Sequence, residues 1–353
     1  MRGQGSGFRN MSTGFTPPAA LGYRMPAEWE RHAATWLSWP HNRDTWPGRF
    51  DPIPDVWRRL VEALAPQETV HVLASGEARE QAVAMVGAIE NVIVHDVPTN
   101  DAWIRDHGPT FLVGPDGLEP ALVDWEYNAW GGKYPPFDAD NAVPGRIAEI
   151  TGRRVFRPGI VMEGGAIDTN GEGLFLAARS CLTDPNRNPD TDTATIERYL
   201  ADYLGAKRTI WIDGTMAGDD TDGHVDQLAR FVGPSTVVVP IERDPGDANY
   251  ASLAATAAQL RGETDLAGRP LQVVELPMPR PVYFDETRAP ACYANFYLAN
   301  GLVLVPQYGD PADAEALEIL AGLFPDRQAV GLPARDLVWG LGAFHCATQQ
   351  EPG

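Results

Sequence analysis

Residues 105–113 read Arg-Asp-His-Gly-Pro-Thr-Phe-Leu-Val, and a Gly-Pro-Asp-Gly stretch at 114–117 separates them from a second apolar run at 121–125. Two short apolar runs joined by a Gly-containing turn are typical of a β-hairpin. The first run is preceded by charged residues, so the pattern predicts a hairpin with polar side chains at its start.

The same pattern occurs three more times along the chain. Apolar runs flank the turns at 169–173, 233–235 and 299–301, and the polar starts are Glu163, His224 and Asn295. Apolar spacing and composition also predict helices at 55–64, 77–89, 195–204, 248–260 and 313–324, with further strands at 34–39, 69–73 and 92–94. Alternating helices and strands indicate an α/β fold.

The spacing of the hairpin starts is regular. Roughly sixty residues separate successive members of the series Asp106, Glu163, His224, Asn295 and Cys346. Self-similarity at a fixed period is typical of a repeat or propeller architecture. If each unit presents its start to a central axis, these side chains meet in one place. The units share no residue identity, so chance regularity is the alternative.

Composition narrows the class of protein. The chain has 353 residues, a net charge of −20 and three cysteines. That charge argues against nucleic acid as a partner and favours a small cation. Few cysteines and no CxxC motif indicate a reducing, cytoplasmic location and no structural zinc site. No run approaches the roughly 18 apolar residues of a membrane helix, so no membrane association is expected.

Length alone would suggest two domains. We predict instead a flexible leader at 1–20, rich in Gly, Ser, Thr and Pro, followed by a single catalytic domain at 21–353. The leader lacks the apolar segment of a secretory signal. Met11 is an alternative start. Segments 184–192, 244–247 and 277–290 are expected to be linkers.

The stretch 340–350, Gly-Leu-Gly-Ala-Phe-His-Cys-Ala-Thr-Gln-Gln, carries the candidate nucleophile Cys346. Its mixed polarity does not indicate a helix or strand that must be buried. A cysteine and a histidine, here His224, are the minimum for catalysis by a thiol. The alternative is that Cys346 only fills a corner of the core.

The candidate acids are Asp106, Glu163 and Asp226. Several anions raise the cost of forming a thiolate, but they suit a cationic substrate. A planar guanidinium fits, because its N–H groups match carboxylates in bidentate pairs. His224 and Asp226 are two apart and would face the same side of a strand. The alternatives to a catalytic or binding role are an ion pair for Asp106, a turn role for Glu163 and solvent exposure for Asp226.

Trp103 and Trp130 are candidate substrate contacts. Each could stack on a guanidinium or on an alkyl chain. Packing in the core is the competing interpretation for both.

The chain resembles the agmatine deiminase family of the guanidine-modifying superfamily. The matching motifs occur in family order at residues 22–29, 100–110, 124–132, 162–166, 186–189, 223–226, 300–310 and 345–350. The resemblance implies a five-bladed α/β propeller of ββαβ-type modules. It also implies hydrolysis of agmatine to N-carbamoylputrescine and ammonia, in putrescine biosynthesis, with no metal or organic cofactor.

The resemblance also implies roles for the candidate residues. Cys346 would attack the guanidinium carbon to form a covalent amidino-thioether. His224 would protonate the departing ammonia and then activate water, with Glu163 orienting it. Asp106 and Asp226 would hold the guanidinium nitrogens.

The sequence departs from the family pattern at several positions. Leu341 and Ala343 replace a Gly and an Asn of the nucleophile loop, and Asp222 stands where Asn is usual. Ala-Arg-Ser at 178–180 replaces a Thr and acidic residues, so Arg179 is expected to alter recognition of the distal end of the substrate if it lines the entrance.

These departures keep other substrates open, namely arginine, peptidyl arginine or a modified agmatine. Arg179, Arg187 and Arg243 cannot be placed from sequence. Amidino transfer to an amine and a non-enzymatic polyamine binder are less favoured, and a papain-like protease is disfavoured because Cys346 follows His224. A homo-oligomer is left open.

Overall fold

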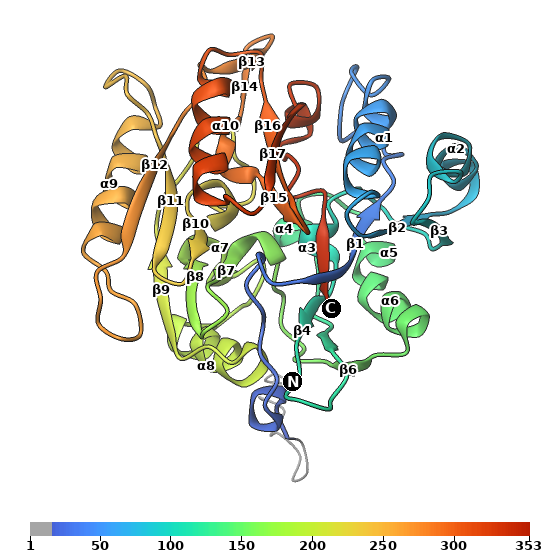
Figure 1. The fold of residues 1–353 in the computed structure, drawn as a ribbon, viewed down its shortest axis with the longest axis horizontal. Coiled ribbons are helices and arrows are strands. Elements are labelled where there is room, and N and C mark those ends of the chain that lie inside the picture. Colours follow the sequence, from blue (N-terminus) through green and yellow to red (C-terminus); the bar gives the residue numbers. More distant parts are fainter. Residues whose placement is uncertain (1–15) are drawn as a thin grey trace, which may run out of the picture.

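The computed structural model describes residues 16–353, and their strands form five separate sheets of three or four strands plus one two-stranded hairpin (Figure 1). Four of the sheets share one order, in which two antiparallel strands are followed by a helix and by a third strand parallel to the second. The structure therefore confirms a mixed α/β fold made of repeated ββαβ units.

The four hairpins predicted from sequence are present. The units are β4 (Thr110–Leu112), β5 (Ala121–Val123), α6 (Val143–Thr151) and β6 (Arg154–Phe156); β7 (Ile167–Thr169), β8 (Leu174–Ala178), α8 (Thr193–Leu204) and β9 (Arg208–Ile212); β10 (Arg230–Gly233), β11 (Thr236–Ile241), α9 (Tyr250–Arg261) and β12 (Gln272–Pro277); and β15 (Tyr297–Ala299), β16 (Leu302–Gln307), α10 (Ala312–Leu323) and β17 (Gln328–Pro333).

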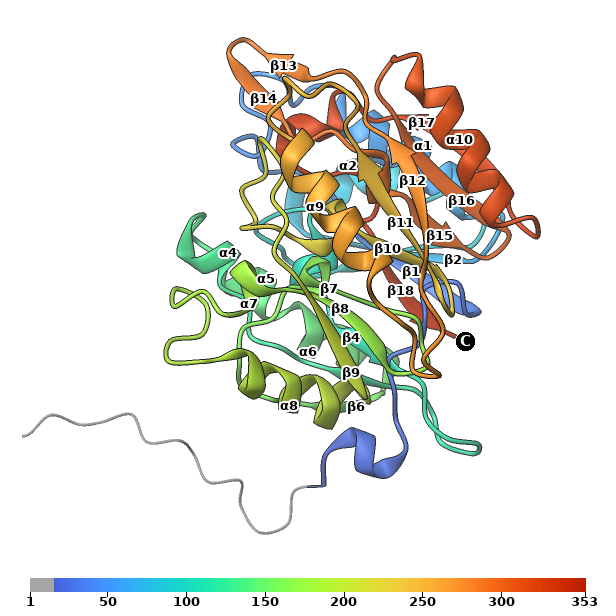
Figure 2. The same ribbon diagram turned by 90° about the vertical axis from the view of Figure 1, so that its left-hand side faces the viewer.

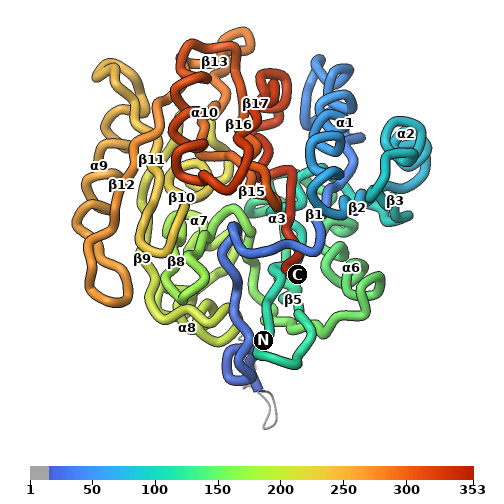
Figure 3. Tube along the Cα trace, viewed as in Figure 1, coloured from blue at the N-terminus to red at the C-terminus, as the bar shows by residue number. Residues whose placement is uncertain are grey.

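The fifth sheet joins the two ends of the described chain. It has the order β18–β1–β2–β3, where β18 (Gln349–Pro352) pairs antiparallel with β1 (His32–Ser38). The tube trace of Figure 3 shows the last residues beside this early strand. Helix α1 (Ile53–Leu64), strand β2 (Thr69–Ala74), helix α2 (Gly76–Val86) and strand β3 (Val92–Asp96) complete the unit.

The prediction for the end of the chain was wrong. Residues 340–350 were not expected to contain a buried element, yet every residue of β18 is buried. Its polar side chains find partners: Arg105 Nη1 donates to Gln350 Oε1 at 2.7 Å, and Trp36 Nε1 donates to Glu351 Oε2 at 2.8 Å. Hydrogen bonds therefore offset the cost of burying these groups.

Helix boundaries follow local chemistry. In α1 the residues Ile53, Trp57, Leu60, Val61 and Leu64 repeat at helical spacing and are buried. In α8 the Asp192 carboxylate caps the first turn by accepting the Thr195 N–H at 2.8 Å, and Gly205, at φ +76°, ends the helix.

Short helices precede the first strand of each of the four units. They are α3 (Ile104–His107), η2 (Gly164–Ala166), η3 (Val225–Gln227) and η4 (Tyr293–Asn295), and each contacts the next in this order. The expectation that His224 and Asp226 lie on a strand was wrong, because residues 225–227 form η3. Its turn is closed by the Leu228 N–H, which donates to the Val225 carbonyl at 2.9 Å.

Two other expectations concern connecting segments. The predicted linker 277–290 contains the hairpin β13 (Val282–Phe284) and β14 (Thr287–Ala289), which in the side view of Figure 2 lies at the end opposite α8. The predicted leader and Met11 lie, up to residue 15, outside the described residues. Beyond them Pro18–Leu21 form the 3-10 helix η1, so the expected boundary at residue 20 falls inside a regular element. Within residues 16–353 no helix is long and apolar enough to span a bilayer.

Candidate active site

Cys346 lies in a loop that follows η5 (Leu337–Gly340) and is held by Asn295 at the end of η4. The Asn295 side-chain carbonyl accepts the N–H groups of Ala343 at 3.1 Å and Cys346 at 3.3 Å. Its amide group donates to Cys346 Sγ at 3.1 Å. One asparagine therefore fixes the loop and contacts the sulfur.

The surroundings of Cys346 disfavour a thiolate. Burial raises the pKa of the Cys346 thiol well above its usual value, and the nearby carboxylates of Asp226 and Asp106 raise it further. Asp226 Oδ2 lies 3.4 Å from the sulfur. The resting sulfur is thus a neutral thiol at neutral pH.

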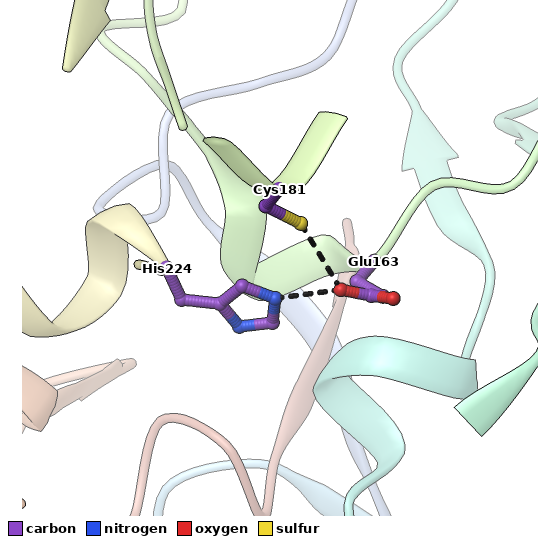
Figure 4. A group of neighbouring side chains, drawn as sticks. All are labelled: Glu163, Cys181 and His224. Atoms are coloured by element: carbon purple, nitrogen blue, oxygen red, sulfur yellow. Dashed lines mark hydrogen bonds and ion pairs between the residues drawn. The ribbon is translucent and has the colours of Figure 1, made fainter. Parts of the chain in front are cut away.

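His224 and Glu163 form a buried pair (Figure 4). His224 Nε2 lies 2.8 Å from Glu163 Oε2, and Arg187 donates to both oxygens of Glu163, at 2.7 and 3.0 Å. Burial alone raises the pKa of Glu163, but the hydrogen bond of His224 and the charge of Arg187 lower it to about 2. Although burial lowers the pKa of His224, the carboxylate of Asp106 and the bonds to Cys181 and Glu163 hold it well above its usual value. The pair is an imidazolium and a carboxylate.

Asp106 and Asp226 face the same place from α3 and η3. Asp106 accepts the indole N–H of Trp130 and the backbone N–H of Gly165, both at 2.9 Å, and its Oδ1 lies 3.7 Å from His224 Nδ1. Asp226 Oδ2 accepts from His345 Nδ1 at 2.8 Å and from Asn295 Nδ2 at 3.1 Å. Burial raises the pKa of Asp106. Burial also acts to raise the pKa of Asp226, but the hydrogen bond and charge of His345 together with the charges of His224 and Arg230 lower it overall.

Two buried polar atoms of this centre, His224 Nδ1 and Asp226 Oδ1, have no hydrogen-bond partner within residues 16–353. Buried polar atoms normally have partners, and an exception suggests that a ligand completes the set. Gly165 leaves room for one, because a Cβ there would lie 2.5 Å from His224 Nδ1 and 3.2 Å from Asp226 Oδ2.

A pocket of about 760 Å³ opens onto this centre. Cys346, Asp106, Trp103 and Trp130 line it, whereas His224, Glu163 and Asp226 lie behind the lining. The position of Trp103 is restricted by the loop, since a Cβ on Gly342 would lie 2.7 Å from its ring and 2.9 Å from Cys346 Cβ. All seven residues proposed from sequence therefore belong to one region, in two layers.

Sequence reasoning missed several members of the site. Arg187 and Cys181 contact Glu163, Asn295 received no role, and His345 bridges Asp226 and Glu28 at 2.8 and 2.9 Å. The Asn-Arg-Asn-Pro motif at 186–189 was the available signal for Arg187. Arg179 and Arg243 lie outside: Arg179 pairs with Asp213 and is absent from the pocket wall, and Arg243 pairs with Glu315.

Glu163, Cys181 and His224 are grouped closely enough to hold a metal ion, with ligand atoms within 4.8 Å of one another. The donor set does not fit one. Arg187 already occupies both carboxylate oxygens of Glu163, and burial raises the pKa of the Cys181 thiol to about 12, so that the sulfur stays protonated. A metal would need the thiolate and would face the guanidinium.

The fold and the site define a mixed α/β protein of repeated ββαβ units in which a cysteine, a histidine and two aspartates meet in one buried centre. The chain belongs to the Porphyromonas-type peptidyl-arginine deiminase family, whose sequence profile matches residues 24–352.

Several similar proteins carry the name agmatine deiminase. The agmatine deiminase of Pseudomonas aeruginosa (strain LESB58) is 37% identical over 97% of this chain and 99% of its own. The structure of the Enterococcus faecalis agmatine deiminase superposes with a TM-score of 0.89 at 32% identity, over 96% of this chain and 98% of that one. The structure of a Cys-to-Ser form of the C. jejuni agmatine deiminase with substrate bound superposes with a TM-score of 0.86 at 31% identity, over 94% of this chain and 96% of that one.

Proposed function

We propose that this protein hydrolyses agmatine to N-carbamoylputrescine and ammonia, with Cys346 as the nucleophile. The observation that carries the proposal is the set of unpartnered atoms, His224 Nδ1 and Asp226 Oδ1, buried beside a thiol and a second carboxylate. The names of the similar proteins support agmatine, and the substrate complex of the Cys-to-Ser C. jejuni enzyme supports a cysteine nucleophile.

The charges of the site explain how the thiol becomes reactive. A guanidinium between Asp106 and Asp226 brings a positive charge next to a sulfur whose pKa those two carboxylates raise. Binding therefore lowers the pKa of Cys346 when the substrate is present. The hydrogen bond from Asn295 stabilises the resulting thiolate.

The reaction then has two halves. The thiol loses its proton to solvent as the substrate binds, the thiolate attacks the guanidinium carbon to form a C–S bond, and the C–N bond to one terminal nitrogen breaks as His224 gives its proton to the leaving ammonia. In the second half neutral His224 takes a proton from water, the hydroxide adds to the amidino carbon, and the C–S bond breaks to return the thiolate while the added hydroxyl group loses its proton to solvent and the neutral ureido product leaves. Glu163, fixed by Arg187, orients His224 through both halves. Asp106 and Asp226 bind the substrate, and Trp103 and Trp130 on the pocket wall contact its tail.

The pocket wall favours agmatine over free arginine. Among its lining residues Lys133 is the one lysine or arginine, and its ammonium is already bound to Asp220 and Asp222, at 3.2 and 2.9 Å. Asp44, Asp101 and Asp140 also line the pocket. An α-carboxylate would meet acids and no uncompensated cation, whereas a second ammonium group is compatible with them.

The proposal extends to the arrangement of the fold. We place the five units around the site as a five-bladed propeller that forms one catalytic domain, residues 21–353. The support is the shared strand order and the meeting of Asp106, Glu163, Asp226, Asn295 and Cys346 from successive units. We place the protein in the cytoplasm because its cysteines, 181, 292 and 346, are all free thiols.

The test is a ureido-group colour assay on purified protein with agmatine, arginine and a blocked arginine peptide, beside Cys346→Ala. Ureido product from agmatine, absent in the variant, is the expected result. Product from the peptide alone would instead assign deimination of peptidyl arginine, the activity for which the family is named. Product from added amine acceptors without ureido formation would indicate amidino transfer, and agmatine binding without turnover would indicate a polyamine binder.

A further inference from the structure

One carboxylate oxygen connects the pocket wall to the residues behind it. Asp222 Oδ2 accepts a hydrogen bond from Lys133 Nζ at 2.9 Å and another from Arg187 Nη1 at 2.7 Å. Lys133 lines the pocket, and the Arg187 side chain is 1% exposed. The two cations therefore share a single acceptor, and a change at one alters the charge that the other experiences.

Arg187 also contacts the acid–base pair formed by Glu163 and His224. It donates to both oxygens of Glu163, and Glu163 Oε2 binds His224 Nε2 at 2.8 Å. A continuous series of charged contacts thus runs from Lys133 through Asp222, Arg187 and Glu163 to His224.

The other charged groups around this series are few. Asp184 Oδ2 also accepts from Arg187 Nη1, at 2.9 Å, and Asp220 accepts from Lys133. At the far end Asp106 Oδ1 lies 3.7 Å from His224 Nδ1, and Asp226 acts on His224 by its charge. Cys181, beside Glu163, is a neutral thiol. Lys133 and Arg187 are thus the two cations that contact Asp222.

Asp222 suits this position in conformation as well as in charge. Its φ is +66°, a left-handed conformation that Asp and Asn adopt more readily than other residues with a side chain. Asn can hold the same backbone conformation but carries no charge. The carboxylate is therefore a feature of this chain that the backbone does not require.

We propose that Asp222 is a positioning residue that couples Lys133, on the pocket wall, to the His224–Glu163 acid–base pair. The inference deepens the proposed function, since it assigns control of the acid–base group to the distal part of the same pocket. When Lys133 is displaced from Asp222, Asp222 attracts Arg187 more strongly. Arg187 then interacts less strongly with Glu163, and Glu163 binds the His224 imidazolium more tightly.

The coupling predicts shifts of opposite sign. Asp222→Asn removes a negative charge, so the pKa of His224 falls. Lys133→Met removes a positive charge, so the pKa of His224 rises. We expect each shift to be roughly half a pH unit to one unit, below the 1 to 3 units typical of a charge in direct contact.

The experiment uses the free protein and so does not depend on any substrate. Histidine ring signals are followed by NMR against pH in isotope-labelled protein, and His224→Gln identifies the signal of His224. The pH profile of Cys346 alkylation by iodoacetamide gives a second readout. Lys133→Arg, which keeps the charge, should leave the titration of His224 unchanged. Asp213→Asn, the same substitution in the exposed Arg179–Asp213 pair, should also leave it unchanged.

The double variant decides whether Asp222 mediates the effect. With Asp222→Asn in place, Lys133→Met should shift the titration of His224 by less than half of its effect in the wild-type background. Additive shifts would mean that Lys133 acts through space alone and would overturn the proposal, as would shifts of the same sign. If the shifts appear while no guanidine is hydrolysed, the coupling holds and the proposed function fails.

Discussion

Gly165 is the position where adding one carbon should damage catalysis most directly. A Cβ there would lie 2.5 Å from His224 Nδ1, 2.9 Å from Asp106 Oδ1 and 3.2 Å from Asp226 Oδ2. Ordinary non-bonded contacts are about 3.5 to 4.0 Å, so Gly165→Ala must displace His224 by about 1 Å. The backbone of Gly165 does not have a positive φ, so the substitution acts through the Cβ and not through backbone strain.

The size of the effect can be estimated from that displacement. A misplacement of about 1 Å at a reacting group costs roughly 100-fold in rate, and overpacking costs about 1 to 3 kcal/mol of stability. We therefore expect kcat/KM for agmatine to fall about 100-fold in the ureido assay, and urea denaturation to show a loss within that range.

The matched control is Gly322→Ala in α10, where a Cβ would meet nothing within 4 Å. It should keep full activity and gain about 0.4 to 1 kcal/mol of stability. Full activity in Gly165→Ala would refute the placement of the substrate between His224, Asp106 and Asp226.

Four further predictions address other parts of the site. Alkylation of Cys346 by iodoacetamide should be slow at pH 7 and rise with pH beyond pH 9, because burial raises the pKa of its thiol; fast labelling at pH 7 would contradict a neutral resting thiol. Asn295→Ala should lower kcat about 10-fold or more through the lost bond to sulfur, while an unchanged kcat would limit Asn295 to holding the loop. Arg187→Met should destabilise the fold by roughly 3 to 5 kcal/mol, since it removes the guanidinium that binds both oxygens of the buried Glu163 carboxylate and leaves His224 as its one cationic contact; a near-wild-type urea midpoint would refute the importance of the Arg187–Glu163 pair. Leu341→Gly should change the free energy of unfolding by less than about 1 kcal/mol, because relief of the strained φ of +72° is offset by the greater backbone entropy that glycine has in the unfolded chain. A loss of more than about 2 kcal/mol would show that the Leu341 side chain is firmly packed.

Much of the architecture could be predicted because local chemistry determines it. The turn at 299–301, for example, is marked by Asn-Gly, and Gly301 has the positive φ of +67° that such a turn needs. The hairpin β13–β14 was missed because each strand has only three residues and proline-containing segments flank it. Strand β18 was missed because Gln-Gln-Glu is typical of an exposed segment, and its partners Trp36 and Arg105 lie 315 and 245 residues earlier in the chain.

The meeting of the candidate residues was predictable where they precede hairpins, as Asp106 before β4–β5 and Glu163 before β7–β8 show. Arg187 and Lys133 could not be placed, because each acts through ion pairs with residues far away in sequence. Arg187 lies in a segment expected to be a linker, and its role depends on Glu163, 24 residues earlier. Lys133 lies 89 residues before Asp222, and no local pattern connects the two.

The pairing of β18 with β1 also bears on how the protein is made. During synthesis β1 emerges early, while its neighbour at residues 349–352 and the proposed nucleophile Cys346 emerge after the other elements described in residues 16–353. A nascent chain can therefore assemble the units that carry Asp106, Glu163 and His224 while it still lacks Cys346 and has an unpaired edge on the sheet of β1. Premature termination before residue 346 would yield a product without the proposed nucleophile and with an open strand edge, a feature that favours aggregation and that quality-control proteases could recognise.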